Sequence, residues 1–515
     1  MKINLKNILI FASIAIVAMS VIVRIIMYIK CRSLWTDEAF LAESIVLRNW
    51  LELLTPPLAN GQSAPVLYVI AVKAISSIFG YSEFSLRIFS FFSFIGLLIC
   101  EVVFLKKIFN FTNCRICFVV VMSALLPGYI WYSNEFKPYM SDAFFVLLSI
   151  LLYFYYTQSK IKLPALTALY ILILGFSSPA VFFIGGTLLF EFVSAILNKN
   201  KKQMLCITIS GIIILVIFVL YYHWWMQPVS EFMRIYWDNY ARGKNIILRI
   251  VQIFSTKDGS RGFLVWFFVP FALLGIYSLC KSKNKITCSL VLSLSFAFLA
   301  SSIGKWPLSG RLWMFLPAII FIFTPVGADI VLNKTKNRKV MSAIGFFVLV
   351  AFILYLSVYC LEHTKHRMYL PRYEVNPLIS YVQDNIKEDE KLYVYLGASI
   401  TFRYKNGYNT TKIGNSADNN IIYGKTRDEW NTGVLGNDMQ SILENKKTYL
   451  LFADYTGEIE NDLAVLRKYR TLIKKINVHL ANYEIENGLV VLQEYGTLTK
   501  IMNVYDTPLY YFERN

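Results

Sequence analysis

The sequence contains little charge for its length, and most of that charge is positive. Only 16% of its 515 residues are Asp, Glu, Lys or Arg, whereas 56% are hydrophobic, and the mean hydropathy is +0.50. Soluble domains carry about 25% charged residues, so this composition excludes a water-soluble globular protein and predicts a membrane protein. The formal net charge of +18 would suggest a nucleic-acid partner in a soluble chain. Here its distribution points to membrane topology instead, and we expect no nucleic-acid partner.

Metal-binding and disulfide patterns are also scarce. Cys114 and Cys117 form a CxxC, but no second Cys or His pair accompanies it, and a zinc site needs about four ligands. No cysteine follows Cys360, which excludes a disulfide framework in the C-terminal region. We therefore predict no metal site from these residues. The absence of an internal repeat also excludes a repeat architecture.

Long apolar stretches dominate the first 360 residues. A membrane helix needs about 20 mostly apolar residues. Ten stretches meet or approach this length: Ile8–Tyr28, Ile88–Leu105, Ile116–Ile130, Ala143–Tyr156, Val181–Leu197, Leu205–Tyr222, Phe263–Cys280, Ile286–Ser302, Leu312–Ile330 and Val340–Tyr359. Leu163–Phe176, with 14 residues, is an eleventh candidate. The N-terminal stretch is too long for a signal peptide and has no small-residue cleavage site, so we interpret it as a retained first span.

The basic residues predict how these spans are oriented, because short cytoplasmic loops collect Lys and Arg. Every second connection is basic: Lys106, Lys107 and Arg115; Lys160 and Lys162; Lys199, Lys201 and Lys202; Lys281, Lys283 and Lys285; Lys334, Lys336, Arg338 and Lys339. This alternation fits about eleven spans with a cytoplasmic N-terminus and an external C-terminus.

One apolar stretch, Pro65–Phe79, would reverse this topology if it crossed the membrane. It is short, it contains Lys73, and it begins with a proline suited to the first position of a helix. We therefore predict a helix on the outer membrane surface, within a first external loop formed by residues 31–87.

The composition changes at residue 361, where apolar runs shorten and charges become frequent. We expect a membrane domain over residues 1–360 and an external α/β domain over 361–515. In the latter we predict a helix capped by Asn376 and continuing to Ile386, strands at Lys391–Leu396 and Tyr449–Phe452, a helix at Glu458–Lys475, and a hairpin at Tyr483–Gln493.

Three polar groups fall in the predicted external loops. Trp35-Thr36-Asp37-Glu38 follows the first span, and Thr36 or Asp37 is as well suited to cap a helix as Asp37 is to act as a base beside a second carboxylate. Tyr132–Asp142 contains Glu135, Lys137, Tyr139 and Asp142 in one short connection, more than the capping of the next helix by Ser141 or Asp142 requires.

The third group is Lys305–Arg311. Its basic pair, Lys305 and Arg311, runs against the positive-inside trend, so it either reaches toward lipid headgroups or binds an anion such as a lipid phosphate. A further external loop, Trp224–Arg261, is rich in aromatic and basic residues, which is typical of an interfacial belt and would also suit a cover over a lipid-linked substrate.

The order of these motifs resembles the GT-C superfamily of integral membrane glycosyltransferases, in particular the protein O-mannosyltransferase and lipid A aminoarabinose transferase group (glycosyltransferase family 39-like). The matching stretches are SLWTDEAFLAESI, NGQSAPVLYVIAVKAISSIFGYSEFSLR, WYSNEFKPYMSDAFF and LSGRLWMFLP. The resemblance implies a polytopic α-helical membrane protein of the GT-C type with a C-terminal extracytoplasmic α/β domain. It covers the first third of the chain closely and the C-terminal domain hardly at all.

The resemblance also implies roles for individual residues. Asp37 looks like the catalytic acid with Glu38 beside it, and Asp142 or Glu135 would be the second acidic position. The remaining candidates for binding substrate or phosphate are Lys137, Arg311, Lys305, Gln62, Tyr139 and Arg87. The aminoarabinose transferases have an acid and a lysine just before the proline of the surface helix, whereas this chain has Gln62-Ser63-Ala64, which weakens any inference to the same sugar.

The implied activity is inverting transfer of a sugar from a polyprenyl (undecaprenyl) phosphate carrier to an acceptor hydroxyl on a glycan, lipid or protein. The expected place is the bacterial inner membrane, where the acceptor would be a cell-surface glycan or lipopolysaccharide O-antigen. No cofactor is required, although the acids leave a role for Mg²⁺ or Mn²⁺ open. The alternatives are a protein O-mannosyltransferase, a transporter or flippase of lipid-linked glycans, and a non-catalytic assembly subunit.

Overall fold

A computed structural model describes residues 5–228, 268–307, 310–334, 374–414, 419–424, 441–451, 496–504 and 507–515. Its contacts divide the chain into two compact units. The first comprises Met1–Lys30 and Ser44–His363, and the second comprises Cys31–Glu43 and Thr364–Asn515. The sequence pattern placed Cys31–Glu43 in the membrane domain, whereas its contacts are with the C-terminal residues.

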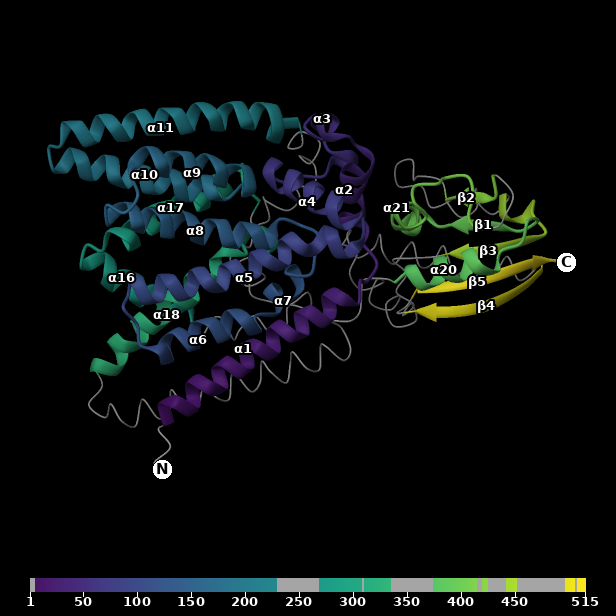
Figure 1. The fold of residues 1–515 in the computed structure, drawn as a ribbon, viewed down its shortest axis with the longest axis horizontal. Coiled ribbons are helices and arrows are strands. Elements are labelled where there is room, and N and C mark those ends of the chain that lie inside the picture. The colour runs from purple at the N-terminus through teal and green to yellow at the C-terminus, as the bar shows by residue number, and fades with distance from the viewer. Residues whose placement is uncertain are drawn as a thin grey trace, which may run out of the picture. The chain divides into compact units, whose positions relative to one another are not determined.

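The first unit is helical, with apolar helices packed against one another (Figure 1). Within the described residues, seven helices are long and apolar enough to cross a membrane: α1 (Leu5–Ile29), α5 (Glu83–Lys107), α8 (Tyr139–Thr157), α10 (Ala180–Leu197), α11 (Lys201–Tyr221), α17 (Lys285–Ser302) and α18 (Phe315–Lys334). Shorter apolar helices are α4 (Val66–Phe79), α6 (Asn113–Leu125), α9 (Leu163–Phe176) and α16 (Val269–Lys281). The chain is a multi-pass membrane protein, and the predicted fold class is confirmed. The predicted span Val340–Tyr359 lies outside the described residues.

The ends of α1 and α5 show why α4 does not act as an additional crossing. The Tyr28 hydroxyl at the end of α1 donates a hydrogen bond of 2.6 Å to the carbonyl of Phe84 at the start of α5, and the two rings are 4.4 Å apart. The end of α1 and the start of α5 therefore lie at the same end of the bundle, so the chain between these two helices makes no net crossing. Helix α4 has 14 residues and packs against α5 and α9. It begins at Val66 with Pro65 as its N-cap residue, so the proline lies one position earlier than predicted.

The helices alternate in direction, so successive connections lie at opposite ends of the bundle, and the two ends carry different residues. One end, called here the basic end, carries the exposed lysines that follow α5, α8 and α10. The other, called here the loop end, carries residues 59–65, 127–138, 177–179 and 310–313. The predicted span Ile116–Ile130 is not one continuous helix, because α6 ends at Leu125 and Pro127 starts a second helix, α7 (Pro127–Tyr132).

The second unit contains a five-stranded mixed sheet in the order β2-β1-β3-β5-β4. Its strands are β1 (Lys391–Val394), β2 (Ile421–Tyr423), β3 (Lys447–Leu451), β4 (Gly496–Val504) and β5 (Thr507–Arg514). The first three strands are parallel, and β5 is antiparallel to both β3 and β4. Helices α20 (Asn376–Asn385) and α21 (Leu396–Lys405) accompany the sheet.

The sequence predicted α20, β1 and β3 but neither α21 nor the β4–β5 pair. Asn376 is the first residue of α20 rather than its cap, and the N-cap position belongs to Val375. The predicted helix Glu458–Lys475 and hairpin Tyr483–Gln493 lie outside the described residues. The main hydrophobic core of this unit joins α20, α21 and the sheet, and it includes Trp35 from the N-terminal half of the chain.

Candidate functional site

The turn between α7 and α8 places a lysine inside the protein at the loop end. Lys137 is 4% exposed, and its ammonium group donates a hydrogen bond to the side-chain oxygen of Gln62. The Ser90 hydroxyl of α5 donates to the Lys137 carbonyl over 3.1 Å. The turn is therefore held from two directions, which fixes the position of a buried cation. Gln62 and Lys137, separated by 75 residues in the sequence, are brought into contact.

Glu135, in the same turn, is 1% exposed. The indole N–H of Trp131 donates a hydrogen bond of 2.6 Å to one of its carboxylate oxygens. Ser133, two residues before Glu135, is held by Arg24 of α1. The Arg24 guanidinium donates a hydrogen bond of 3.1 Å to the Ser133 hydroxyl and lies 3.8 Å from the centre of the Phe94 ring. No pattern in the sequence connected Arg24 with this turn.

Helix α8 begins directly after the turn and carries two more of the predicted residues. Pro138 precedes the helix, so Ser141 and Asp142 lie in its first turn and neither is its cap. Asp142 is 4% exposed and lies beside Ser177 and Ser178. Its Oδ1 atom is buried and has no hydrogen-bond partner among the described residues. A second buried carboxyl group, after that of Glu135, thus lies in the first helical turn after Lys137.

Tyr139 and Arg311 meet at the same end of the bundle. Arg311 lies in the short 3₁₀ helix Gly310–Trp313, and its guanidinium carbon is 5.7 Å from the centre of the Tyr139 ring. This distance is within the range of a cation–π interaction. Because Tyr139 is 6% exposed, its ring is a fixed surface that orients the guanidinium group. The sequence predicted both residues without predicting their contact.

Two aromatic residues, Trp225 and Tyr221, hold the segment that carries Gln62. The sequence did not predict these contacts. The Trp225 indole donates a hydrogen bond of 2.8 Å to the Ala64 carbonyl, and the Tyr221 hydroxyl accepts one of 3.3 Å from the Val66 N–H. Trp225 belongs to the aromatic loop that the sequence predicted as a membrane belt or a substrate cover. In the structure it positions the chain just after Gln62, while residues 229–267 lie outside the described residues.

The remaining two basic candidates differ in burial. Arg87 lies on α5 and is 2% exposed. Lys305 follows α17 and is exposed. Its ammonium group has no hydrogen bond or ion pair within the described part of the chain. The structure therefore provides no contact that joins Lys305 to the turn around Lys137.

Asp37 and Glu38 belong to the second unit and lie in the first turn of α2 (Thr36–Leu47). Glu38 is fully buried, and one of its carboxylate oxygens accepts from the Arg32 guanidinium over 3.1 Å and from the Trp35 backbone N–H over 3.3 Å. Trp35 directly precedes the helix, so Thr36 and Asp37 are its first two residues rather than its cap, and the contact of Glu38 with the Trp35 N–H is one half of a capping box. Asp37 is half-buried, and it is not the residue that accepts the hydrogen bond from the Trp35 N–H.

Among the described residues, no group of three His, Cys, Asp or Glu side chains is close enough together to hold a metal ion. Binding of Mg²⁺ or Mn²⁺ by these acids therefore stays a prediction from the sequence.

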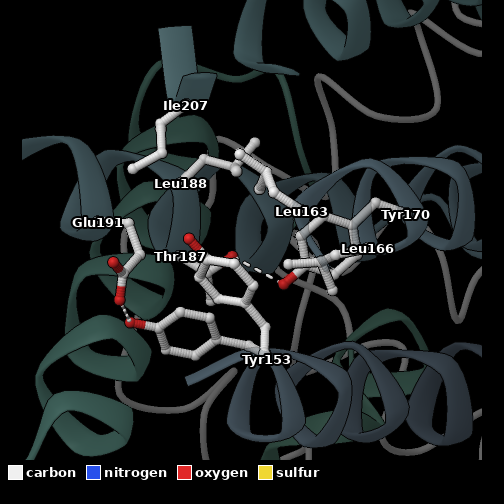
Figure 2. Close-up of a pocket in the computed structure, with 9 residues that line it drawn as sticks. Tyr153, Leu163, Leu166, Tyr170, Thr187, Leu188, Glu191 and Ile207 are labelled. Carbon is white, nitrogen blue, oxygen red and sulfur yellow. Dashed lines mark hydrogen bonds between the residues drawn. The ribbon is translucent and has the colours of Figure 1, made fainter. Parts of the chain in front are cut away.

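A second polar cluster lies at the basic end of the bundle, around a small cavity between α8, α9, α10 and α11 (Figure 2). The buried Glu191 accepts a hydrogen bond of 2.7 Å from the Tyr153 hydroxyl and one of 3.1 Å from the Gln203 amide. Tyr170 and Thr187 form a further hydrogen bond of 3.1 Å across this cavity. Each oxygen of Glu191 thus has a partner on another helix, as expected of a group that holds helices together.

Comparison with known proteins yields structural matches alone. No family model matches the chain, and no curated protein sequence matches it. Two crystal structures of ArnT from Cupriavidus metallidurans match 97% of this chain and 97% of theirs at 11% sequence identity. The TM-score is 0.51 for the apo structure and 0.52 for the one bound to undecaprenyl phosphate. At this identity the likeness shows the fold alone: this chain has a fold similar to that of ArnT, and the expected fold class is confirmed.

Proposed function

We propose that the protein is a glycosyltransferase that moves a sugar from a polyprenyl-phosphate carrier to an acceptor hydroxyl at the loop end of its membrane bundle. The observation that carries the proposal is the buried Lys137, held by Gln62 in a turn that also contains buried Glu135. Lys137 lies in the connection between α7 and α8, and an ammonium group held at a fixed position is suited to bind the phosphate of a lipid carrier. The likeness in fold to an ArnT structure bound to undecaprenyl phosphate supports this choice of carrier.

The leaving group of such a reaction is a lipid phosphate, which requires charge stabilisation more than protonation. Lys137 and Arg311 are the cations that we assign to this role. Lys137 is fixed by Gln62, and Arg311 is oriented by the Tyr139 ring. Cations that are already in position stabilise a developing charge without reorganising during the reaction.

Asp37 is the proposed general base, which would accept the proton of the acceptor hydroxyl as its oxygen attacks the anomeric carbon. A single displacement of this kind inverts the anomeric centre. Support comes from the position of Asp37: it is half-buried in the first turn of α2, whereas the neighbouring carboxylate of Glu38 is fully buried and bound to Arg32 and to the Trp35 N–H. General-base assistance contributes typically about 10²–10⁴-fold. Glu135 and Asp142 are the candidates for the second acidic position.

The charges inside the helices argue for surface chemistry rather than transport. Transporters keep charged groups near mid-membrane on broken helices. Here Arg24 and Glu191 lie within two turns of the ends of α1 and α10, and both are hydrogen-bonded to neighbouring helices. They are accounted for as structural groups. The proposed acceptor is a cell-surface glycan such as the lipopolysaccharide O-antigen, at the outer face of the bacterial inner membrane.

The test is release of free polyprenyl phosphate by the purified protein from a panel of polyprenyl-phosphate sugars, with acceptor-bearing membranes supplied. We expect release from one donor, a loss of roughly 10²–10⁴-fold in Asp37→Asn, and normal release in the control Asp329→Asn. Asp329 pairs with Arg115 at the basic end, so the control removes a charge of the same kind away from the loop end.

Each other result has a definite meaning. Transfer of the sugar to a protein rather than a glycan would identify a protein O-mannosyltransferase type of activity. If no donor releases polyprenyl phosphate, the proposed function is wrong, and transport or assembly of lipid-linked glycans replaces it.

A further inference from the structure

The segment that carries Asp37 is built into the C-terminal domain, meaning the described elements α20, α21 and β1–β5. Trp35 is 5% exposed and belongs to the same hydrophobic core as Leu378 of α20 and Phe402 of α21. A buried aromatic side chain contributes a large share of the stability of the core that it enters. Trp35 therefore anchors residues 31–43 in the core of a domain whose other elements lie far along the chain.

A second set of contacts fixes the backbone of this segment next to Trp35. The carboxylate of Glu374, 8% exposed, accepts hydrogen bonds from the Ser33 hydroxyl and from the Ser33 N–H over 3.1 Å. The Ser33 hydroxyl in turn accepts from the N–H groups of Val375 and Asn376, over 3.2 and 3.0 Å. Val375 occupies the N-cap position of α20, and its apolar side chain cannot accept a hydrogen bond. Ser33, from a distant part of the chain, caps the helix instead.

The same segment is also held on both sides of Asp37. Before it, the Thr401 hydroxyl of α21 donates a hydrogen bond of 3.0 Å to the Leu34 carbonyl. After it, Arg403 of α21 forms an ion pair of 3.0 Å with Glu43. These two contacts and the Glu374 cap restrict the segment before and after Asp37, so the position of the Asp37 carboxyl group follows that of the C-terminal domain.

We propose that the C-terminal domain positions Asp37, with Glu374 as the principal positioning residue and Arg403 as the second. Glu374 is chosen because a buried carboxylate at the N-terminus of α20 is stabilised by the helix dipole and serves several donors at once. The consequence for catalysis rests on the proposed function of Asp37, whereas the docking of residues 31–43 does not.

The test combines hydrogen exchange with kinetics on the full-length protein in nanodiscs. We expect Glu374→Ala to raise amide exchange in residues 31–38 by about tenfold or more, since hydrogen bonds to a charged group are lost. The donor KM should stay the same while kcat falls by roughly 100-fold, as expected when a reacting group is misplaced by about 1 Å. Glu374→Gln keeps an acceptor oxygen, so it should restore most of both properties.

Glu390→Ala is the matched control. Glu390 is also a buried carboxylate of the C-terminal domain, but it accepts from the Lys387 N–H and the Tyr511 hydroxyl. Its loss should leave exchange in residues 31–38 at the wild-type level even if the domain becomes less stable.

Three results would overturn the inference. Unchanged exchange in Glu374→Ala would show that the cap does not hold the segment, and an equal rise in Glu390→Ala would show general loosening of the domain. Raised exchange with an unchanged kcat would show that docking does not position Asp37. If the wild-type protein releases no polyprenyl phosphate, the proposed function fails, and the exchange data alone then decide whether the segment is docked through Glu374.

Discussion

The two ends of the membrane bundle contain the same types of residue in opposite arrangements. At the basic end the lysines are exposed, as Lys202 is, and the buried acid Glu191 has a hydrogen-bond partner for each oxygen. At the loop end Lys137 is buried, and one oxygen of the buried Asp142 has no partner among the described residues. The comparison suggests how to separate structural from functional charge in such a protein. Under the proposed function, Glu191 with both oxygens hydrogen-bonded is a structural group, whereas Asp142 keeps an oxygen with which it could bind a ligand.

Replacing a lysine at each end should produce the largest contrast. In Lys137→Met we expect kcat/KM for the lipid-linked donor to fall by about 10²–10³-fold, because a fixed cation at the developing phosphate charge is lost. In Lys202→Met, at the basic end, release of polyprenyl phosphate should match the wild type. Similar losses in both variants would mean that lysines act here through general membrane binding and would remove the distinction between the ends.

The acid at the basic end should affect stability instead of turnover. Glu191→Ala leaves the Tyr153 hydroxyl and the Gln203 amide without their partner, at a cost of about 1–3 kcal/mol for each buried group left unsatisfied. Glu191→Gln should cost less, because an oxygen still accepts from Tyr153. Thermal unfolding in detergent measures both changes. A turnover number that drops in the folded Glu191→Gln protein would contradict a purely structural role.

A smaller effect is expected from the ring beneath Arg311. Tyr139→Leu removes the cation–π contact, which is worth about 0.5–1 kcal/mol at such sites, and we expect the donor KM to rise by about two- to fivefold. Tyr139→Phe keeps the aromatic face and serves as the control. An equal rise of the donor KM in both variants would show that the Tyr139 hydroxyl, rather than its ring, is the relevant group.

Local patterns predicted much of this fold. The apolar stretches and the alternating lysines located the spans, and the strand propensity of Lys391–Leu396 located β1. Prolines were the main source of error in the helices, since Pro127 divides a predicted span and Pro65 precedes its helix instead of starting it. Both errors reflect the detailed placement of helix ends, which a periodic apolar pattern does not determine.

The candidate site was predictable as a set of residues but not as a set of contacts. The two acids and the lysine of the 132–142 turn stood out because they were crowded into a short connection. The partners that fix them come from distant helices, such as Gln62 for Lys137 and Arg24 for Ser133. The capping of α20 by Ser33 joins residues 343 positions apart. Contacts over such separations leave no periodic signal in the sequence.

The most direct test of the central claim is binding of undecaprenyl phosphate, measured by native mass spectrometry on the wild type, Lys137→Met and Lys202→Met. We expect one bound lipid phosphate in the wild type and in Lys202→Met, and affinity reduced by about tenfold or more in Lys137→Met, because a buried charge-assisted contact is lost. Equal binding by all three proteins, or the loss of binding in Lys202→Met alone, would contradict a carrier-phosphate site at the loop end.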